Sequence, residues 1–385
     1  MKRNLFIRVL SFVLCLTLFT SVFSFSAAED SEDESVSDEE LAELLQMEEE
    51  ADEDGPQSVL GRVFVEPDRT EFNANSPALY RAKLESNTSI LSERNQQTGK
   101  KLCYNTKSVY VDVLYVGLVW VVVRYEKHIG YVKRPRVIYN SIEPVDPVNT
   151  PPFGLQIQNY IATVGEDCSV RHSMSDDDAA FVTLHKGARI TLWRIIDGWG
   201  IVTYMRNYGY INMNNLENLI PISHTDTPLS ADTPIAAYTS YYKMDKTDSN
   251  KNRIFNIRHG AELVSRTLQP GGKFNFNADI GPFNRTGFKK ATVLVDGKAK
   301  PGYGGGTCQV SSTLYNCLKI LPGITINQRR PHGPGGASYL PIFCDAAVGN
   351  DSLNLRFTNS YSFPIRIEGY SQDDGALFFA IYRAD

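Results

Sequence analysis

The sequence predicts a multidomain protein in which two small all-β barrels precede an α+β domain. Three observations lead to this prediction. The first half of the chain carries an internal repeat rich in Val, Ile, Tyr and Thr, residues 221–236 are dominated by Pro, Ser, Thr and Asp, and helix-type spacing of apolar residues begins only after that break. A duplicated β unit, a linker and a mixed domain are therefore expected in this order.

The N-terminal segment has the layout of a secretory signal peptide over residues 1–28. Lys2, Arg3 and Arg8 precede an apolar run, and small residues end the segment at Ala28, where we expect cleavage. No later run approaches the ~18 to 20 apolar residues that span a bilayer. We therefore expect a secreted, extracytoplasmic protein that associates with the cell wall and is not an integral membrane protein after cleavage; an uncleaved N-terminal anchor is the alternative.

An acidic segment follows over residues 29–56. Its stretch "EDSEDESVSDEELAELLQMEEEADED" holds 15 Asp and Glu and no Lys or Arg, so we expect it to be disordered. Because the whole chain carries a net charge of −5, the remainder is mildly basic, which suits an anionic environment such as a cell wall. The segment either screens this basic body during export or is a solvated tail without consequence.

The cysteine count argues against a disulfide-rich scaffold. Five remain after the expected cleavage: Cys103, Cys168, Cys308, Cys317 and Cys344. An odd number in an exported chain leaves at least one free thiol, and Cys103 with Cys168 is a candidate pair. Neither CxxC nor HExxH spacing occurs, so we expect no metal and no cofactor. We also expect no nucleic acid partner.

The repeat relates residues 78–145 to residues 158–220. Trp-x4-Tyr-x4-Gly-Tyr occurs in "WVVVRYEKHIGYV" from Trp120 and again in "WGIVTYMRNYGYI" from Trp199, 79 residues later. Short alternating runs such as "ARITLWRI" are typical of a small antiparallel barrel. The second copy, with "SVR", "KGARITL" and "GWGIV", resembles the bacterial SH3 family, and the first copy resembles a more diverged member.

This resemblance implies a diverged SH3-like domain over residues 57–146 and an SH3-like domain over residues 155–220, which would bind wall peptides or act as spacers. The linker 221–236 then leads to a domain over residues 237–385. There the spacing of apolar residues predicts a helix that ends at "QPGG", "KFNFN" predicts a strand, and Asp296-Gly297 predicts a turn. The helical positions are Ile254, Ile257, Ala261, Val264 and Leu268.

A glycine run leads directly into a second predicted helix in "GYGGGTCQVSSTLYNCLKILPG". With Thr307 as the N-cap, its hydroxyl would accept from the amide of Gln309 or Val310 and leave Cys308 in the first turn. Free amides and the positive helix end would favour the thiolate there. The glycine run lacks the Gly-Lys-Ser/Thr ending of a phosphate-binding loop. Cys308 is either an activated nucleophile or a thiol that packs a tight turn, whereas Cys317 lies in the apolar stripe of the helix and is expected in the core.

The stretches "PGGKFNFN", "GGGTCQVSSTLYN", "RRPHGPGGASYLP" and "DAAV" together resemble the VanW domain family over residues 235–385. Members of that family have been associated with L,D-transpeptidation of peptidoglycan. The resemblance implies Cys308 as the nucleophile and His332 as its base. The chain departs from the family where it places Phe343 and Cys344 instead of a Pro-Gly-Leu-like turn, which puts the rim of the site in doubt.

Several residues around this pair are further candidates for the site. The backbone or loop of Gly305, Gly306, Thr307 and Gln309 would hold an oxyanion. Asp345, Tyr339 or a backbone carbonyl would orient the imidazole, since a thiol and imidazole pair needs such a group. Candidate substrate-binding residues are Arg329, Arg330 and Tyr339, although the two arginines are equally well explained as solvated cations.

The function that follows from the resemblance is an exported L,D-transpeptidase that acts on peptidoglycan stem peptides. Cys308 would form a thioester and transfer the stem to a second stem as a 3-3 cross-link, or to water as an L,D-carboxypeptidase. The alternative is a non-catalytic protein that binds peptidoglycan or acts as a scaffold in the wall. The sequence leaves the oligomeric state open.

Overall fold

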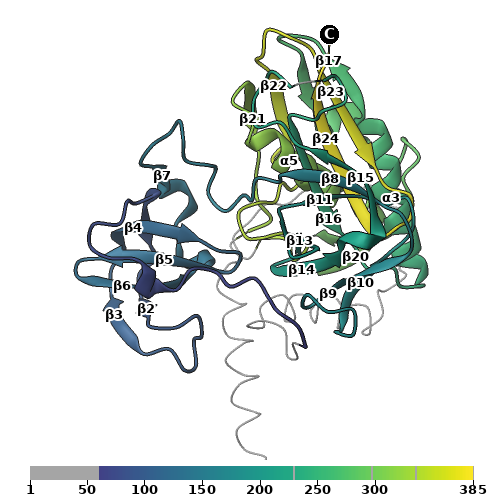
Figure 1. Ribbon diagram of the computed structural model, residues 1–385. Coiled ribbons are helices and arrows are strands. Elements are labelled where there is room, and N and C mark those ends of the chain that lie inside the picture. The colour runs from purple at the N-terminus through teal and green to yellow at the C-terminus, as the bar shows by residue number, and fades with distance from the viewer. Residues whose placement is uncertain (1–59, 229, 296–297, 334–335, 385) are drawn as a thin grey trace, which may run out of the picture. The chain divides into compact units, whose positions relative to one another are not determined.

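The computed structural model describes residues 60–228, 230–295, 298–333 and 336–384 (Figure 1). These residues form mostly β-sheet, with few helices. The predicted signal peptide, the acidic segment 29–56 and the turn at Asp296-Gly297 lie outside the described residues. Among the helices of the described ranges, none combines the length and apolar character needed to cross a membrane.

The first repeat folds into one antiparallel sheet with the strand order β3-β2-β6-β5-β4-β1-β7. Apolar residues of β1 alternate with polar ones, and Ala82 and Leu84 are fully buried in its core. The strands are β1 (Tyr80–Leu84), β2 (Thr88–Leu91), β3 (Lys101–Asn105), β4 (Val109–Val116), β5 (Trp120–Tyr125), β6 (His128–Lys133) and β7 (Glu143–Pro144), with single turns η1 (Arg69–Glu71), η2 (Arg134–Arg136) and η3 (Tyr139–Ser141).

The second repeat has the same strand order, divided between two sheets. These are β10-β9-β14-β13-β12 and β11-β8-β15, and both contribute to one core. The strands are β8 (Tyr160–Val164), β9 (Cys168–Arg171), β10 (Ala180–Leu184), β11 (Arg189–Leu192), β12 (Arg194–Ile196), β13 (Trp199–Tyr204), β14 (Asn207–Asn212) and β15 (Leu216–Pro221), with the turn η4 (Met213–Asn215).

The duplication is therefore visible in the topology. A single strand, β4, corresponds to the pair β11 and β12, which Trp193 separates. Both copies also make the same tight turn, because Glu126 and Met205 adopt φ of 52° and 54° at equivalent positions. No sheet of the described residues closes into a barrel, so the predicted SH3-like barrels are not confirmed. Among the repeated aromatic residues, Trp120, Tyr131 and Tyr210 are buried core residues.

The C-terminal domain consists of three small sheets and two main helices. The sheets have the orders β16-β24-β23-β17, β18-β22-β21 and β19-β20. The elements are β16 (Ala236–Tyr241), α3 (Asp248–Val264), β17 (Arg266–Leu268), β18 (Lys273–Asn275), α4 (Phe276–Ile280), β19 (Lys290–Val295), β20 (Lys298–Tyr303), α5 (Thr307–Lys319), β21 (Ile324–Gln328), β22 (Arg356–Asn359), β23 (Ile365–Tyr370) and β24 (Ala376–Arg383).

The first predicted helix ends earlier than its apolar spacing indicated. Leu268 lies in β17 and pairs with Ile365 of β23, so its helical spacing from Val264 is coincidental. Helix α3 ends at Val264, and its C-cap is Ser265, whose hydroxyl donates to the carbonyl of Ala261 at 2.8 Å. The last three strands of the chain are β22, β23 and β24.

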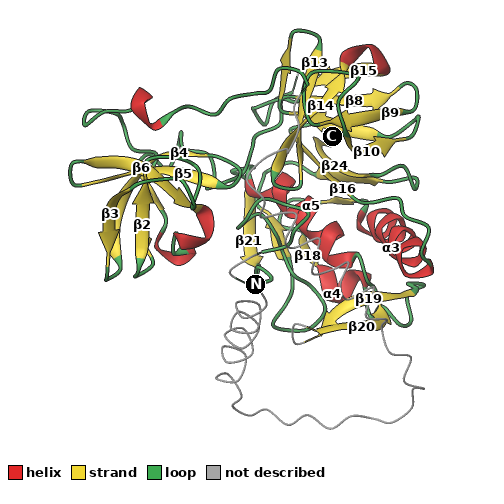
Figure 2. Cartoon of the chain, turned by 90° about the horizontal axis from the view of Figure 1, so that it is seen from below, coloured by secondary structure: helices red, strands yellow, loops and turns green. Residues whose placement is uncertain are grey.

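Strand β24 is buried on both faces, which explains its unbroken apolar run "ALFFAIY". Phe379 and Ile381 point into the core that contains α3 and α5. Phe378 and Ala380 point to the opposite face, where Ile222 covers them. Helix α5 packs against β16 and β24, α3 packs against β23 and β24, and the two helices contact each other (Figure 2).

Candidate active site

Cys308 lies in the first turn of α5, immediately after the glycine run. The N-cap is Gly306, with a left-handed φ of 102°, so the prediction that Thr307 caps the helix was wrong. The hydroxyl of Thr307 instead donates to the carbonyl of Gly304 at 2.8 Å. A Cβ at Gly306 would lie 3.0 Å from the carbonyl oxygen of Arg253 in α3. Glycine is therefore required both for the backbone angle and for the close contact with α3.

The amides around Cys308 fall into two groups. Those of Thr307 and Gln309 donate to the carbonyls of Gly304 and Gly306, each at 3.0 Å. Neither amide is therefore free to receive an oxyanion, although the sequence analysis named both residues as candidates for that role. In the described ranges, the amides of Gly305, Gly306 and Cys308 donate to no protein acceptor. Three unpaired amides thus surround the start of the helix beside the thiol.

His332 is oriented by Asp345. The Nδ1 atom of His332 lies 2.7 Å from Oδ2 of Asp345, and the backbone amide of His332 donates to the same oxygen at 2.6 Å. The side chain of Asp345 is only 1 % exposed, whereas that of His332 is 24 % exposed. The carboxylate occupies Nδ1 and directs Nε2 away from itself. Of the three orienting groups considered from the sequence, the structure places Asp345 at the imidazole.

Cys308 interacts with the imidazole, while the hydrogen bonds of its sulfur run to Val348, whose carbonyl accepts from Sγ and whose amide donates to Sγ, both at 3.5 Å. Burial by itself would lower the pKa of His332, but the interactions with Asp345 and Cys308 outweigh it and raise this pKa to about 10. Burial by itself would raise the pKa of Asp345, but the hydrogen bonds and the charge of His332 outweigh it and hold this pKa below its usual value. Cys308, His332 and Asp345 therefore form a connected series.

Arg329 binds the segment that carries Asp345 and is therefore not available to a substrate. Its Nε donates to the carbonyl of Asp345 at 2.7 Å, and its Nη2 donates to the carbonyl of Phe343 at 2.6 Å. Nη2 also lies 3.5 Å from Oδ1 of Asp345, and the side chain is 6 % exposed. Arg330, by contrast, is exposed.

The polar face of α5 attaches the segment that carries Asp345. Ser311 donates to the carbonyl of Ala346 at 2.6 Å, and the amide of Ala346 donates to Ser312 at 2.8 Å. Asn316 donates to the carbonyl of Cys344 at 2.7 Å. These buried hydrogen bonds explain why the sequence "SSTLYN" is polar although it lies in the core. The nucleophile and the orienting carboxylate are thus held on one rigid unit.

Tyr339 lies at the edge of the site. Its ring centre is 6.5 Å from that of His332 at an angle of 87°, and its hydroxyl is 3.5 Å from Oγ of Ser312. Burial and the nearby charge of Cys308 raise the pKa of Tyr339 well above its usual value, so its hydroxyl is neutral at physiological pH.

Arg253 of α3 reaches the same site and was missed in the sequence. Its Nη2 donates to Oε1 of Gln309 at 2.6 Å. The sequence did contain a sign of this role. Arg253 lies one helical turn before Ile257, so a charged residue occupies a position on the apolar face of the predicted helix. The side chain of Gln309, fully buried, donates to Oγ of Ser240 and to the carbonyl of Tyr241, both at 2.9 Å. Gln309 therefore positions Arg253.

The other thiols lie away from this arrangement. All five described cysteines are free, so the candidate disulfide between Cys103 and Cys168 does not form. Burial raises the pKa of Cys317, which is fully buried as expected for a core residue. Burial also raises the pKa of Cys344, although the charge of Arg134 opposes this.

The departure from the family pattern lies where the domain meets the first repeat. Phe343 has φ of 74°, and its ring packs 5.0 Å from that of Tyr139 and 6.0 Å from that of Phe153. Ile342 belongs to the same apolar cluster. Phe343 therefore serves the contact with the first repeat, while Asp345, two residues later, serves the site.

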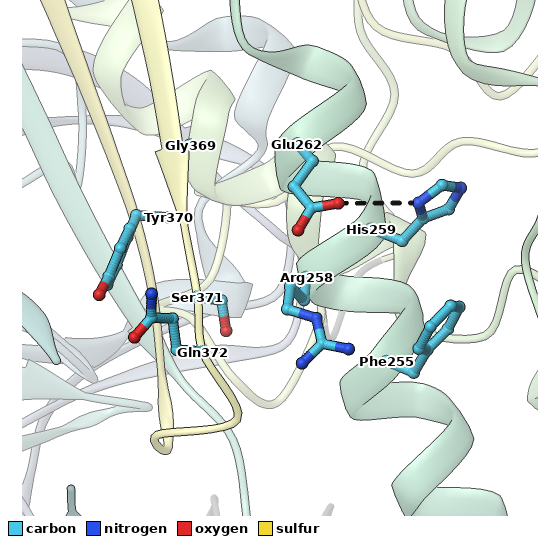
Figure 3. A pocket seen from close by; sticks show the side chains of 8 residues that line it. All are labelled: Phe255, Arg258, His259, Glu262, Gly369, Tyr370, Ser371 and Gln372. Carbon is cyan, nitrogen blue, oxygen red and sulfur yellow. Dashed lines mark ion pairs between the residues drawn. The ribbon is translucent and has the colours of Figure 1, made fainter. Parts of the chain in front are cut away.

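A hollow of about 560 Å³ lies on the outer face of α3 (Figure 3). Its lining includes His259, whose Nε2 lies 2.7 Å from the carbonyl of Thr286 and whose Nδ1 lies 4.0 Å from Glu262. None of Cys308, His332 and Asp345 lines this hollow. His259 is consequently not part of the site around Cys308.

Comparison with known proteins identifies the C-terminal domain. Residues 252–382 match the family described as "VanW like protein". This part of the chain is a VanW-like domain. A protein of Bacillus subtilis (strain 168), described as "Uncharacterized protein YoaR", is 34% identical over 153 residues, which cover 39% of this chain and 48% of that protein. The chain therefore spans about half the length of this relative.

Two solved structures from Trichomonas vaginalis show a weak likeness to the chain as a whole. NlpC2 is 10% identical and the comparison covers 81% of this chain and 100% of NlpC2, with a TM-score of 0.15. NlpC1 is 12% identical, with coverage of 82% and 96% and the same TM-score of 0.15. At this score neither likeness carries an argument about the VanW-like domain.

Proposed function

We propose that the VanW-like domain is a cysteine acyltransferase that acts on peptidoglycan stem peptides as an L,D-transpeptidase. The observation that carries the proposal is the series of Cys308, His332 and Asp345 at the N-terminus of α5. A thiol, an imidazole and an orienting carboxylate are the groups that covalent acyl transfer requires. The link of VanW-like proteins to the cell wall supports a wall substrate.

The first half of the proposed reaction forms a thioester. The Cys308 thiolate attacks the carbonyl of the third stem residue, and the amides of Gly306 and Cys308 receive the developing oxyanion. When the carbon–nitrogen bond breaks, the His332 imidazolium donates its proton to the departing amine. The raised pKa of His332 supports this step, since the imidazolium is the main form at neutral pH.

The second half releases the enzyme. The neutral imidazole of His332 takes a proton from the amine of a second stem as that amine attacks the thioester. The carbon–sulfur bond breaks, the thiolate returns, and the product is a 3-3 cross-link. If water attacks instead, the product is a stem shortened by its last residue, which is the L,D-carboxypeptidase reaction.

The two repeats would serve as wall-binding modules of the SH3-like kind. Their duplicated topology supports a common role for both copies. An exported location is part of the same proposal, because the substrate lies outside the cytoplasm. The arrangement would place catalysis on the VanW-like domain and attachment on the repeats.

Muropeptide mass spectrometry tests the function directly. The purified protein is incubated with disaccharide-tetrapeptide, and we expect the mass of a cross-linked dimer or of a tripeptide. Cys308→Ala should abolish both products, and His332→Ala should reduce their rate by on the order of 10² to 10⁴-fold. Absence of product from the unmodified protein would leave the non-catalytic wall-binding alternative, and full activity of Cys308→Ala would refute Cys308 as the nucleophile.

A further inference from the structure

We propose that Arg253 binds the free carboxylate of the donor's last residue, and that it thereby selects stem peptides with a single residue after the bond that is cleaved. The inference rests on the acyl-transfer function proposed above and names the substrate class for it. A donor with a terminal carboxylate would be preferred over one that continues further or ends in an amide.

The guanidinium of Arg253 donates to a neutral side chain, whereas that of Arg258 on the same helix pairs with a carboxylate. Its Nη2 donates to Gln309, and it forms no ion pair with any described residue. On the same helix, Arg258 pairs with Asp373 at 2.9 Å. Asp245 is near enough to influence Arg253, but it accepts from the amide and hydroxyl of Thr247 at 3.1 and 2.8 Å. Arg253 therefore makes no direct ion pair with a described carboxylate.

The position of Arg253 places this charge beside the nucleophile. Its Cγ would lie 3.2 Å from a Cβ on Gly306, so the side chain runs along the start of α5. Gln309, which directly follows Cys308, holds the guanidinium in place through its own bonds to Ser240 and Tyr241.

The chemistry of a peptide end fits this placement. Three covalent bonds separate the carbonyl carbon that the thiolate attacks from the carboxylate of a single remaining residue. A carboxylate therefore falls close to the thiol only when one residue follows the cleaved bond. Apart from the bond to Gln309, the N–H groups of Arg253 donate to no acceptor in the described part of the chain, and a guanidinium binds a carboxylate best through two parallel N–H groups. Burial lowers the pKa of Arg253, and an incoming carboxylate would offset that cost.

Binding to protein that cannot turn over is the first measurement. In the Cys308→Ala background, isothermal titration calorimetry compares disaccharide-tetrapeptide with the same compound ending in a carboxamide. We expect the acid to bind on the order of 10 to 100-fold more tightly than the amide. Arg253→Gln should remove this preference, and Arg253→Lys should retain part of it. Arg258→Gln removes a cation from the outer face of the same helix (Figure 3) and should leave the preference unchanged.

Turnover separates this inference from the function on which it rests. With Cys308 present, Arg253→Gln should lower kcat/KM for the acid by a larger factor than for the amide. Equal binding of acid and amide, binding of neither, or an acid preference that survives Arg253→Gln would each overturn the role of Arg253. An acid preference that depends on Arg253, in a protein that forms no thioester or product, would keep the carboxylate site and refute the transferase. Thermal melting of each variant confirms that it is folded.

Discussion

Exposure separates Cys308 from the other thiols of the VanW-like domain. Cys308 is half-buried at the junction of loop and helix, whereas Cys317 and Cys344 are at most 1 % exposed. Among these thiols, only Cys308 interacts with His332 and lies beside the unpaired amides at the start of α5. Its accessibility and its place at the helix N-terminus therefore favour reaction at this one sulfur.

Alkylation measures this difference. Iodoacetamide at neutral pH should modify Cys308 faster than Cys317 by a factor on the order of 10² or more, because the buried thiol reacts only when the fold opens. Peptide mass spectrometry over a time course gives both rates in one sample. Cys308→Ala should keep the thermal unfolding midpoint, since loss of a half-buried sulfur creates little cavity. Equal labelling, or unfolding of Cys308→Ala, would show that the thiol serves packing.

The protonation of His332 couples stability to pH. Its pKa is about 10 in the folded protein against an ordinary 6.5, so its stabilising contribution is fully present below pH 6.5 and is lost as the pH rises through about 10. Asp345→Asn removes a main cause of the raised pKa. Urea unfolding between pH 6 and 10 should therefore show a weaker loss of stability in Asp345→Asn than in the unchanged protein. Identical slopes would contradict the coupling of Asp345 to His332.

At the level of elements, α5 is the part that unites the site. Its N-terminus carries the nucleophile, and its polar side chains bind the backbone of the segment that carries Asp345. The glycine run lets the same end of the helix approach α3, from which Arg253 reaches the site. Small shifts between α5 and this segment would consequently separate the thiol from its imidazole.

Ser312→Ala tests this attachment. The buried amide of Ala346 would lose its acceptor, which should cost about 1 to 3 kcal/mol in the free energy of unfolding. We also expect a fall in the alkylation rate of Cys308, because Asp345 and His332 would no longer be held in place. Thr325→Ala, which removes a hydroxyl from an exposed pair with Ser360, is the matched control and should change neither quantity. Unchanged stability of Ser312→Ala would show that the segment is held by other contacts.

At the scale of the molecule, the proposed function assigns wall binding and chemistry to different parts of the chain. The repeats hold their own buried aromatic residues, and the thiol and imidazole belong to the VanW-like domain. Binding to the wall should then be independent of the nucleophile.

A sedimentation assay with purified sacculi tests this separation. The full chain and its Cys308→Ala variant should bind to the same extent within twofold, because neither repeat contains the changed residue. Loss of binding in Cys308→Ala would mean that the VanW-like domain makes the main contact through its site. Failure of both proteins to bind would assign the repeats a spacer role.

The duplication and the helix that begins beside Cys308 could be predicted from the sequence, whereas the linker over residues 221–236 stays a prediction. Each depends on residues close together in the chain, through aromatic spacing, turn-forming residues or helical periodicity. The resemblance to the VanW family added Cys308 and His332. Asp345 was one of several candidates for orienting His332, because nothing in the neighbouring sequence distinguishes it from the others.

Only the tertiary structure decided how these parts meet. It left the sheets of the repeats open, ended α3 before Leu268, chose Asp345 as the partner of His332 and brought Arg253 to the site. It also explained the polar residues of α5 as partners for a distant backbone segment. These outcomes depend on contacts between residues far apart in the chain, and the local pattern of polar and apolar residues carries no information about which distant partner a side chain will find.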